Sequence, residues 1–209
     1  MGDPAAGLTA AGLTAAGLTA AGLDGSGLVM ARVRRSRGRP VVSLSAAETH
    51  LLRGLLGQFD ETLAARAPAR SDDPLEAAVG IADGPAEPPA DPGLARLVPA
   101  GYRDDPEAAA ELRRLTEPAL LHAKIDAARR LVESLPERSG KVTLDGESAA
   151  GWIGTLNDLR LVLGTRLGVT EDGDPLGGHR RTAPRAAPYV IYHWLTALQD
   201  RLVDAVDLD

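Results

Sequence analysis

Residues 152–168 read WIGTLNDLRLVLGTRLG, and this stretch decides the fold class. Wound as a helix at about 100° per residue, it gathers its apolar side chains on one broad face, which is typical of an amphipathic helix packed on a core. With one residue from the preceding turn, that face comprises Ala149, Trp152, Ile153, Leu156, Leu159, Leu163 and Leu167. We expect the helix to begin at Asp145 or Gly146 and to end at Gly168, a C-terminal glycine.

One charged residue, Arg160, lies within this apolar face. Because an unpaired charge is costly to bury, the side chain must extend to solvent or bond to a buried acceptor. Gln199 interrupts the apolar face of the last expected helix and is a natural partner. A carboxylate such as Glu117 or Asp126 is the alternative, because charge-assisted hydrogen bonds are stronger. We therefore predict that Arg160 and Gln199 belong to a structural polar core where two helices pack together.

A capping box opens the first expected helix. Ser45 and Glu48 stand three residues apart ahead of apolar residues at helical spacing, and we expect the helix to run to about Ala65. The last helix is expected to begin near Pro188. Its apolar face comprises Ile191, Leu195, Leu198, Leu202 and Ala205.

Two prolines mark the middle of the chain. Asp105 followed by Pro106 is typical of a helix start. Pro118 interrupts this segment, and we expect a fresh helix to start there, because proline lacks an N–H and clashes with the preceding turn. The restarted helix is expected to stop at Pro136. Its core positions are Leu121, Ile125, Ala128, Val132 and Leu135.

Short strands are expected on either side of the glycine-containing segment 36–39. Residues 28–35 and 40–44 read as a hairpin, and residues 141–144 are a candidate third strand. Because an isolated hairpin is marginally stable in water, it must pack on the helices. We expect a mainly α fold, a bundle of four to five helices with a small N-terminal β-hairpin.

Low-complexity segments divide the chain. Residues 1–28 repeat Ala-Ala-Gly-Leu-Thr, and a period of five fits neither a helix nor a strand. We expect a disordered tail rather than a pentapeptide-repeat β-helix, and Met30 is an alternative to Met1 as the native start. Residues 29–209 are expected to form a single domain, with a Pro-rich connection at about 67–103 that holds at most one short helix near 75–79.

The composition excludes several function classes. The chain has no cysteine and only four histidines among its 209 residues, and no pair of histidines has metal-ligand spacing. Thiol catalysis, disulfides and cysteine-zinc sites are therefore excluded. With no catalytic constellation or phosphate-binding fingerprint, we expect neither an enzyme nor a cofactor. No apolar run approaches the ~20 residues of a membrane span, so we expect a cytoplasmic protein with no membrane partner.

Arginines gather in the expected hairpin although the net charge is −6. The hairpin carries Arg32, Arg34, Arg35, Arg37 and Arg39 with no acid among them. Alternate arginines on one strand can bind phosphates, as in β-ribbon DNA readers, and Arg180 and Arg181 would supply a second basic site. The alternative is that these arginines are a solvated edge that prevents edge-to-edge pairing, and a solvated loop.

Three segments together resemble one known family. They are residues 102–117 (YRDDPEAAAELRRLTE), 156–168 and 192–203 (YHWLTALQDRLV). They resemble an actinobacterial family long catalogued as a domain of unknown function and now named an oxidative-stress transcriptional regulator family. The resemblance spans roughly residues 32–206. It implies a transcriptional regulator of the oxidative-stress response, whose redox sensing implies cysteine chemistry that this chain cannot perform.

Two function hypotheses follow. The first is a transcriptional regulator without an internal thiol switch, which binds DNA through the arginine hairpin. The second is a non-catalytic interaction or adaptor module that acts on the transcription machinery or another partner. A DNA binder should place its arginines on one contiguous face, whereas an adaptor should scatter them. The sequence supplies no oligomeric state.

Overall fold

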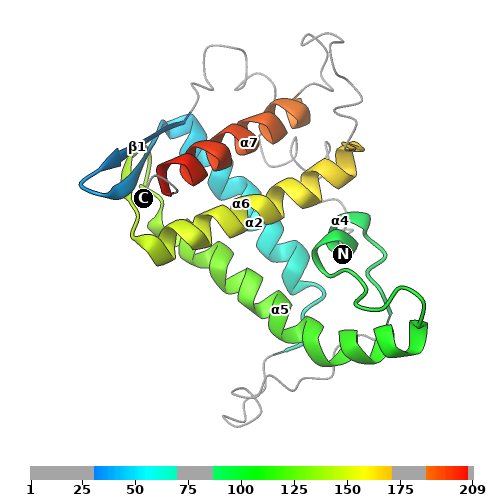
Figure 1. The fold of residues 1–209 in the computed structure, drawn as a ribbon. Helices are drawn as coiled ribbons and strands as arrows, with labels where there is room; N and C mark the ends of the chain where they lie inside the picture. The colour runs from blue at the N-terminus through cyan, green and yellow to red at the C-terminus, as the bar shows by residue number, and fades with distance from the viewer. Residues whose placement is uncertain (1–30, 70–86, 171–186, 207–209) are drawn as a thin grey trace.

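The computed structural model describes residues 31–69, 87–170 and 187–206, and these are mainly helical (Figure 1). Within them lie five helices and one three-stranded sheet. In chain order the elements are β1 (Arg32–Ser36), β2 (Arg39–Leu44), α2 (Ala46–Ala64), α4 (Pro92–Leu97), α5 (Pro106–Ser134), β3 (Gly140–Thr143), α6 (Gly146–Leu167) and α7 (Ala187–Val206). The expected fold class is confirmed. The repeat tail and the short helix expected near 75–79 lie outside the described residues.

The sheet has the order β1-β2-β3, with both pairs antiparallel. The expected third strand is therefore present and covers the second edge of β2. Arg37 and Gly38 alone form the turn between β1 and β2, with φ angles of 52° and 77°. Positive φ at both central residues is the requirement of a type I′ turn, whose twist matches that of the paired strands. The turn is thus tighter than the four-residue loop that the sequence indicated.

α2 begins at the predicted capping box. The Ser45 hydroxyl accepts from the Glu48 N–H, and the Glu48 carboxylate accepts from the Ser45 N–H at 2.7 Å. The other carboxylate oxygen of Glu48 accepts from the indole N–H of Trp194 on α7 at 3.2 Å. Glu48 is 2% exposed, so a single buried carboxylate caps α2 and binds α7.

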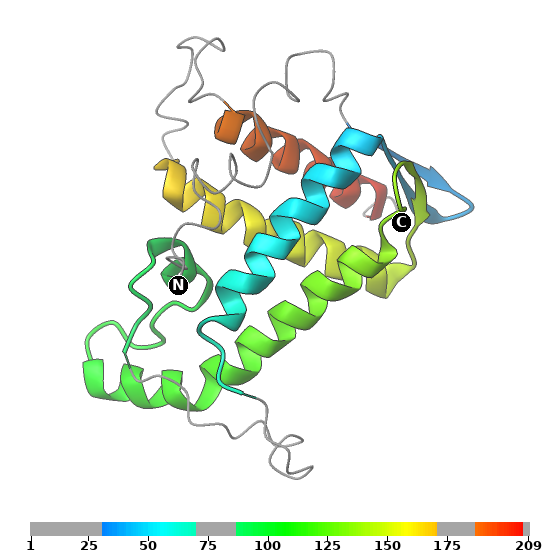
Figure 2. The same ribbon diagram turned by 180° about the vertical axis from the view of Figure 1, so that it is seen from behind.

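α5 corrects the expectation that Pro118 starts a new helix. The helix is continuous from Pro106 to Ser134, with Pro118 inside it. Figures 1 and 2 show that α5 bends part-way along, and a proline is the usual cause of such a bend, because it removes the backbone bond to the carbonyl four residues earlier. On the core-facing side of this helix Leu131 is buried, whereas Val132, which the sequence predicted to be a core residue, is only partly buried.

α4 is a second correction, because the Pro-rich connection contains a helix that the sequence did not indicate. Asp91 caps it by accepting from the Leu94 N–H at 2.8 Å, and Pro92 fills its first turn. Leu94 and Leu97 are buried in the main core. The Asp-Pro signal is the one that marked the start of α5, but a short helix among many Pro and Gly residues has too few turns to show periodicity.

α6 lies at the centre of the bundle, where it packs against α7, α4 and α5. Its predicted boundaries hold, with Asp145 as N-cap and Gly168 as a left-handed C-cap with φ 71°. α7 packs beside it and also contacts β1 and β2. The guanidinium of Arg201 on α7 donates to the carbonyl oxygen of Ala31 at 2.7 Å, so the last helix holds the start of the first strand.

Candidate functional site

The outer face of the sheet is the strongest candidate for a binding site. Residues of β1 alternate between two faces, and Val33 pairs with Val42, which is fully buried in the core. Arg32 and Arg34 therefore lie on the opposite face, and both are exposed. Consecutive residues on one strand face are about 6.6–6.8 Å apart, so the two guanidinium groups share one surface.

The strand register adds two more cations to this outer face. Arg39 on β2 pairs with Ser36, which lies two residues after Arg34 and therefore on the same face of β1. Lys141 on β3 pairs with Ser43, whose other partner is Arg32, so Lys141 and Arg32 lie in one row across the sheet. Both added residues are exposed. The outer face thus presents Arg32, Arg34, Arg39 and Lys141, and sequence reasoning missed Lys141 because strand pairing is not readable from charge spacing.

The remaining hairpin arginines occupy different positions. Arg35 lies on the inner side of β1, opposite Pro40, and is partly buried. Arg37 occupies the turn and is exposed. In the part of the chain that the structure describes, Arg32, Arg34 and Arg37 make no hydrogen bond or ion pair. Their charges are therefore available to a ligand, whereas Arg180 and Arg181 lie outside the described residues.

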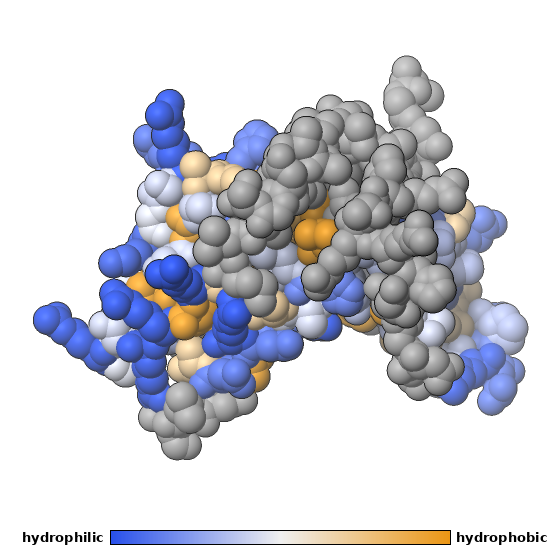
Figure 3. Space-filling model, turned by 90° about the horizontal axis from the view of Figure 1, so that it is seen from above, coloured by the Kyte–Doolittle hydropathy of each residue, from blue (hydrophilic) through white to orange (hydrophobic). Residues whose placement is uncertain are grey.

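One carboxylate lies beside the basic face. Asp145, the N-cap of α6, has its pKa held below the ordinary value first by the Ser148 N–H and side chain, with a smaller contribution from the positive charge of Arg39. Asp145 is exposed and caps α6, and its negative charge reduces the positive field of Arg39. Where described residues are visible from above, hydrophilic residues surround separate apolar patches (Figure 3).

Arg160 and Gln199 lie together where α6 packs on α7. The Arg160 guanidinium donates to the Gln199 side-chain oxygen and, at 3.0 Å, to the hydroxyl of Thr196. It also lies 5.8 Å from the ring centroid of Tyr192, within cation–π range. Gln199 is 8% exposed and donates in turn to the Ile153 carbonyl. This is the expected partner, and the cluster lies between helices rather than on a binding face.

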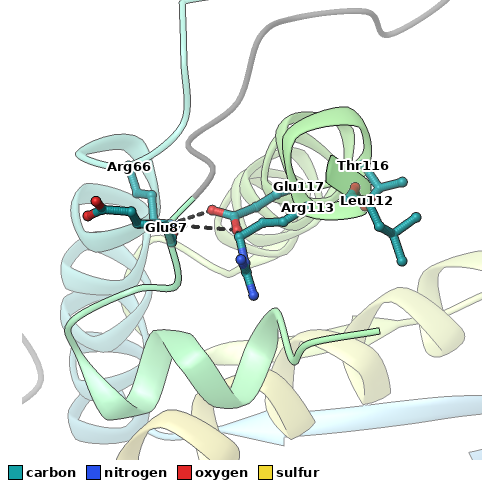
Figure 4. Close-up of polar contacts among 6 residues, drawn as sticks. All are labelled: Arg66, Glu87, Leu112, Arg113, Thr116 and Glu117. Carbon is teal, nitrogen blue, oxygen red and sulfur yellow. Dashed lines mark hydrogen bonds and ion pairs between the residues drawn. The ribbon is translucent and has the colours of Figure 1, made fainter. Parts of the chain in front are cut away.

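Glu117, the alternative partner considered for Arg160, belongs to another cluster. It is 2% exposed, and Arg66, in the turn after α2, donates to both of its oxygens (Figure 4). Arg113 lies 3.8 Å from the same carboxylate, one turn earlier on α5. Arg66 also donates to the Glu87 carbonyl at 2.7 Å. The cluster fixes the bend of α5 to the end of α2, and no sequence pattern joins residues so distant.

Lys124 and Asp158 form a second interhelical ion pair that the sequence did not indicate. The Lys124 ammonium lies 2.8 Å from both carboxylate oxygens of Asp158 and links α5 to α6. Burial raises the pKa of Asp158, and the hydrogen bond and charge of Lys124 oppose that shift. The pair joins helices and faces no recognisable ligand site.

Metal and membrane chemistry find no support among the described residues. Across residues 31–69, 87–170 and 187–206, no three His, Asp or Glu side chains gather closely enough to hold a metal ion. None of the helices described is both long and apolar enough to cross a bilayer.

Comparison with known proteins identifies the family. The model of the family described as "Domain of unknown function (DUF2017)" matches residues 30–206. The chain belongs to the DUF2017 family. Among curated proteins, the oxidative stress regulators AosR of Mycobacterium bovis and Mycobacterium tuberculosis are 39% identical over 175 residues, covering 77% of this chain and 79% of theirs. The putative oxidative stress regulator AosR of Mycobacterium leprae is 38% identical over 172 residues, covering 75% of this chain and 76% of its own.

The resemblance noted in the sequence is therefore confirmed. The matched region of this DUF2017 member contains the basic sheet and all five described helices. No solved structure matches the chain.

Proposed function

We propose that this DUF2017 protein regulates the oxidative-stress response by binding DNA through the outer face of its sheet. The observation that carries the proposal is the alternation of exposed arginines on β1, with Arg39 and Lys141 beside them on the same face. The regulatory role comes from curated relatives whose names are oxidative stress regulators.

The physical argument rests on where the positive charge lies. With a net charge of −6, the surface as a whole repels nucleic acid, so binding requires a local basic surface. Arginine presents a planar fork of donors that matches a phosphate, and a short antiparallel sheet can lie against a DNA groove or backbone. Ser43, partly buried between Arg32 and Lys141, adds a hydroxyl to the same row.

The chain has no thiol with which to sense an oxidant, because its 209 residues include no cysteine. We infer that an oxidative signal reaches this protein through another molecule. We also infer that it is not an enzyme and takes no cofactor, and that it acts in the cytoplasm.

The second candidate is an adaptor that contacts a protein of the transcription machinery. Arg35, which points to the inner side of the sheet, and Asp145, which lies beside Arg39, favour it, because a dedicated DNA surface would keep its cations together and free of acids. The two candidates differ in whether purified protein binds duplex DNA without a partner.

The test is the salt dependence of binding to a mixed-sequence duplex, measured by fluorescence anisotropy. Arg34→Ala should weaken binding and lower the slope of log K against log salt by about 0.9 for a lost phosphate contact. Lys141→Ala should act alike. Arg96→Ala is the matched control, because Arg96 is exposed on α4, which Figure 1 places at the opposite end of the molecule from β1.

Unchanged affinity and slope in Arg34→Ala and Lys141→Ala would mean that DNA does not contact the outer face of the sheet. No binding by the wild-type protein at low salt would reject DNA binding and leave the adaptor.

A further inference from the structure

The outward side of α5 carries an exposed stripe that contains no charged residue. Three of its leucines are unusually accessible for large apolar side chains: Leu112 is 37%, Leu115 46% and Leu120 40% exposed. In helical projection they lie on one side with three other exposed residues. We call this set the α5 stripe, and it consists of Leu112, Leu115, Thr116, Ala119, Leu120 and Ala123.

Apart from Leu112, which lies against Gly101 in the loop before α5, the stripe faces away from the contacts that hold α5 in the fold. The inner side of the helix carries Glu117, bound to Arg66, and the buried core residues Leu121 and Ile125. Figure 4 shows Leu112 and Thr116 on the opposite side of α5 from the ion pair. An uncharged helix face three turns long is unexpected on the surface of a chain in which 25% of residues are charged.

The stripe has a twofold arrangement about its centre, midway between residues 117 and 118. Leu115 and Leu120 are equidistant from that point, as are Thr116 and Ala119, and Leu112 and Ala123. When two copies cross antiparallel at the centre, each residue of a pair therefore faces its counterpart on the other chain. Such self-complementarity is the requirement for a symmetric dimer, in which one surface contacts itself.

Charges beyond the two ends of the stripe favour the same orientation. Asp105, at the start of α5, is exposed, and so is Arg130, which lies at the same distance on the other side of the centre. Antiparallel pairing brings Asp105 of one helix toward Arg130 of the other, whereas parallel pairing brings each of them toward its own copy. Leucine against leucine at the centre and opposite charges at the ends fit a second copy of this chain.

We propose that the α5 stripe is the contact surface of a homodimer, with two α5 helices crossing antiparallel at Leu115 and Leu120. One helix on one helix is a small interface, so the dimer is weak, with Kd on the order of micromolar. The dimer would leave the basic sheet free, since β1 lies on the other side of the molecule from the bend of α5 (Figures 1 and 2). The proposal does not rest on DNA binding.

Sedimentation velocity of the full chain across a wide concentration range tests the proposal. The wild-type protein should pass from monomer to dimer. Leu115→Arg and Leu120→Glu should each shift the midpoint at least tenfold higher, because each places an unpaired charge against a leucine. Val206→Arg is the control, since Val206 is an exposed apolar residue on α7 (38%) and lies outside the stripe.

The decisive experiment restores the contact between residues 115 and 120 with a pair of opposite charges. The double variant Leu115→Arg, Leu120→Glu and an equimolar mixture of the two single variants should both dimerise again, because antiparallel pairing places each arginine opposite a glutamate. Circular dichroism checks that every variant is folded. A wild-type monomer at the highest concentration, a dimer insensitive to either single variant, or failure of both restoring arms would each overturn the proposal.

Discussion

The Arg160 guanidinium on α6 donates to the side-chain oxygen of Gln199 on α7, and Thr196 accepts a second bond from the same group. Tyr192 lies over the guanidinium, and Gly164, one turn further along α6, lies against the Tyr192 ring. Arg160 interrupts the apolar face of α6, and Gln199 interrupts that of α7. The two interruptions therefore meet where the helices pack together.

Removing the Arg160 side chain should destabilise this contact. Arg160→Ala leaves the Gln199 and Thr196 acceptors without their donor, and we expect a loss of about 1–3 kcal/mol in the free energy of unfolding. Arg160→Met keeps the apolar stem over Tyr192 and should lose less. Urea unfolding followed by circular dichroism gives both values. Equal losses in the two variants would mean that the stem contributes nothing.

The close approach of α6 and α7 depends on Gly164. A Cβ at this position would lie 3.0 Å from a Tyr192 ring carbon, so Gly164→Ala requires the Tyr192 ring, which also lies over Arg160, to shift, and should cost about 1–3 kcal/mol. Gly154 is a matched control on the same helix, because a Cβ there meets nothing within 4 Å. Gly154→Ala should stabilise the protein by about 0.5–1 kcal/mol through helix propensity. Thermal melts that rank the two variants in the opposite order would contradict the packing.

The buried Glu117 should be sensitive to loss of its charge. Glu117→Gln keeps the shape but removes the negative charge that faces Arg66 and Arg113, and we expect a loss of about 3 kcal/mol. Glu111→Gln is the control, since Glu111 pairs with Arg114 at the exposed surface, where water and salt screen the pair, and its loss should leave stability nearly unchanged. Chemical denaturation of both variants measures the difference in the free energy of unfolding. Similar losses would mean that the buried charge of Glu117 contributes no more to stability than an exposed one.

The Lys124–Asp158 pair predicts a pH dependence. Because burial raises the folded-state pKa of Asp158 above its ordinary value of 3.8, the folded state binds this proton more tightly than the unfolded state does. Its contribution to stability is therefore full below 3.8 and is lost as the pH rises through the raised pKa. Lys124→Met removes the group that opposes the shift, so the variant should lose more stability at neutral than at mildly acidic pH.

Asp158→Asn is the matched control for this pair, because it removes the titrating group. Because Asn resembles the neutral carboxyl, its stability should be close to that of the wild type at low pH and should exceed it increasingly as the pH rises, opposite in sign to Lys124→Met. Unfolding curves over a pH series measure both trends. A Lys124→Met difference that does not change with pH would show that Asp158 does not titrate there.

An oxidant should have no direct effect on the purified protein. With no cysteine in the chain, diamide should change neither its mobility on a non-reducing gel nor its affinity for DNA. A change that dithiothreitol reverses would contradict the inference that the signal comes from another molecule.

Local patterns predicted most of the fold. The capping box at Ser45, the αL glycine at Gly168 and the apolar face of α7 each depend on neighbours within two turns, and the structure confirms them. The predicted face of α6 is confirmed except that Ile153 and Leu167 are only partly buried, while Val162, which was not predicted, is fully buried. Pro118 was misread because a local rule was applied without tertiary context: Glu117 and Pro118 are both buried at the bend, and Arg66 binds Glu117 there, while the helix continues through the proline. α4 was missed because six residues are too few for periodicity.

The candidate site was less predictable for a related reason. Alternation along β1 indicated which of its arginines share a face, but Lys141 joins them only through a strand more than one hundred residues away. The partners of Glu117 and Lys124 depend likewise on how α5 meets α2 and α6, which no spacing along the chain encodes.

The bond between Arg201 and the Ala31 carbonyl has a consequence for synthesis on the ribosome. α7 adds the last contacts to the first strand and to the cap of α2, through Arg201 and through the Trp194–Glu48 bond. The N-terminal elements therefore stay incompletely covered until nearly the whole chain has left the ribosome. Contacts of such long sequence separation also slow folding. A nascent chain that stalls before α7 exposes the very surface that α7 covers, which makes it a substrate for chaperones and proteases.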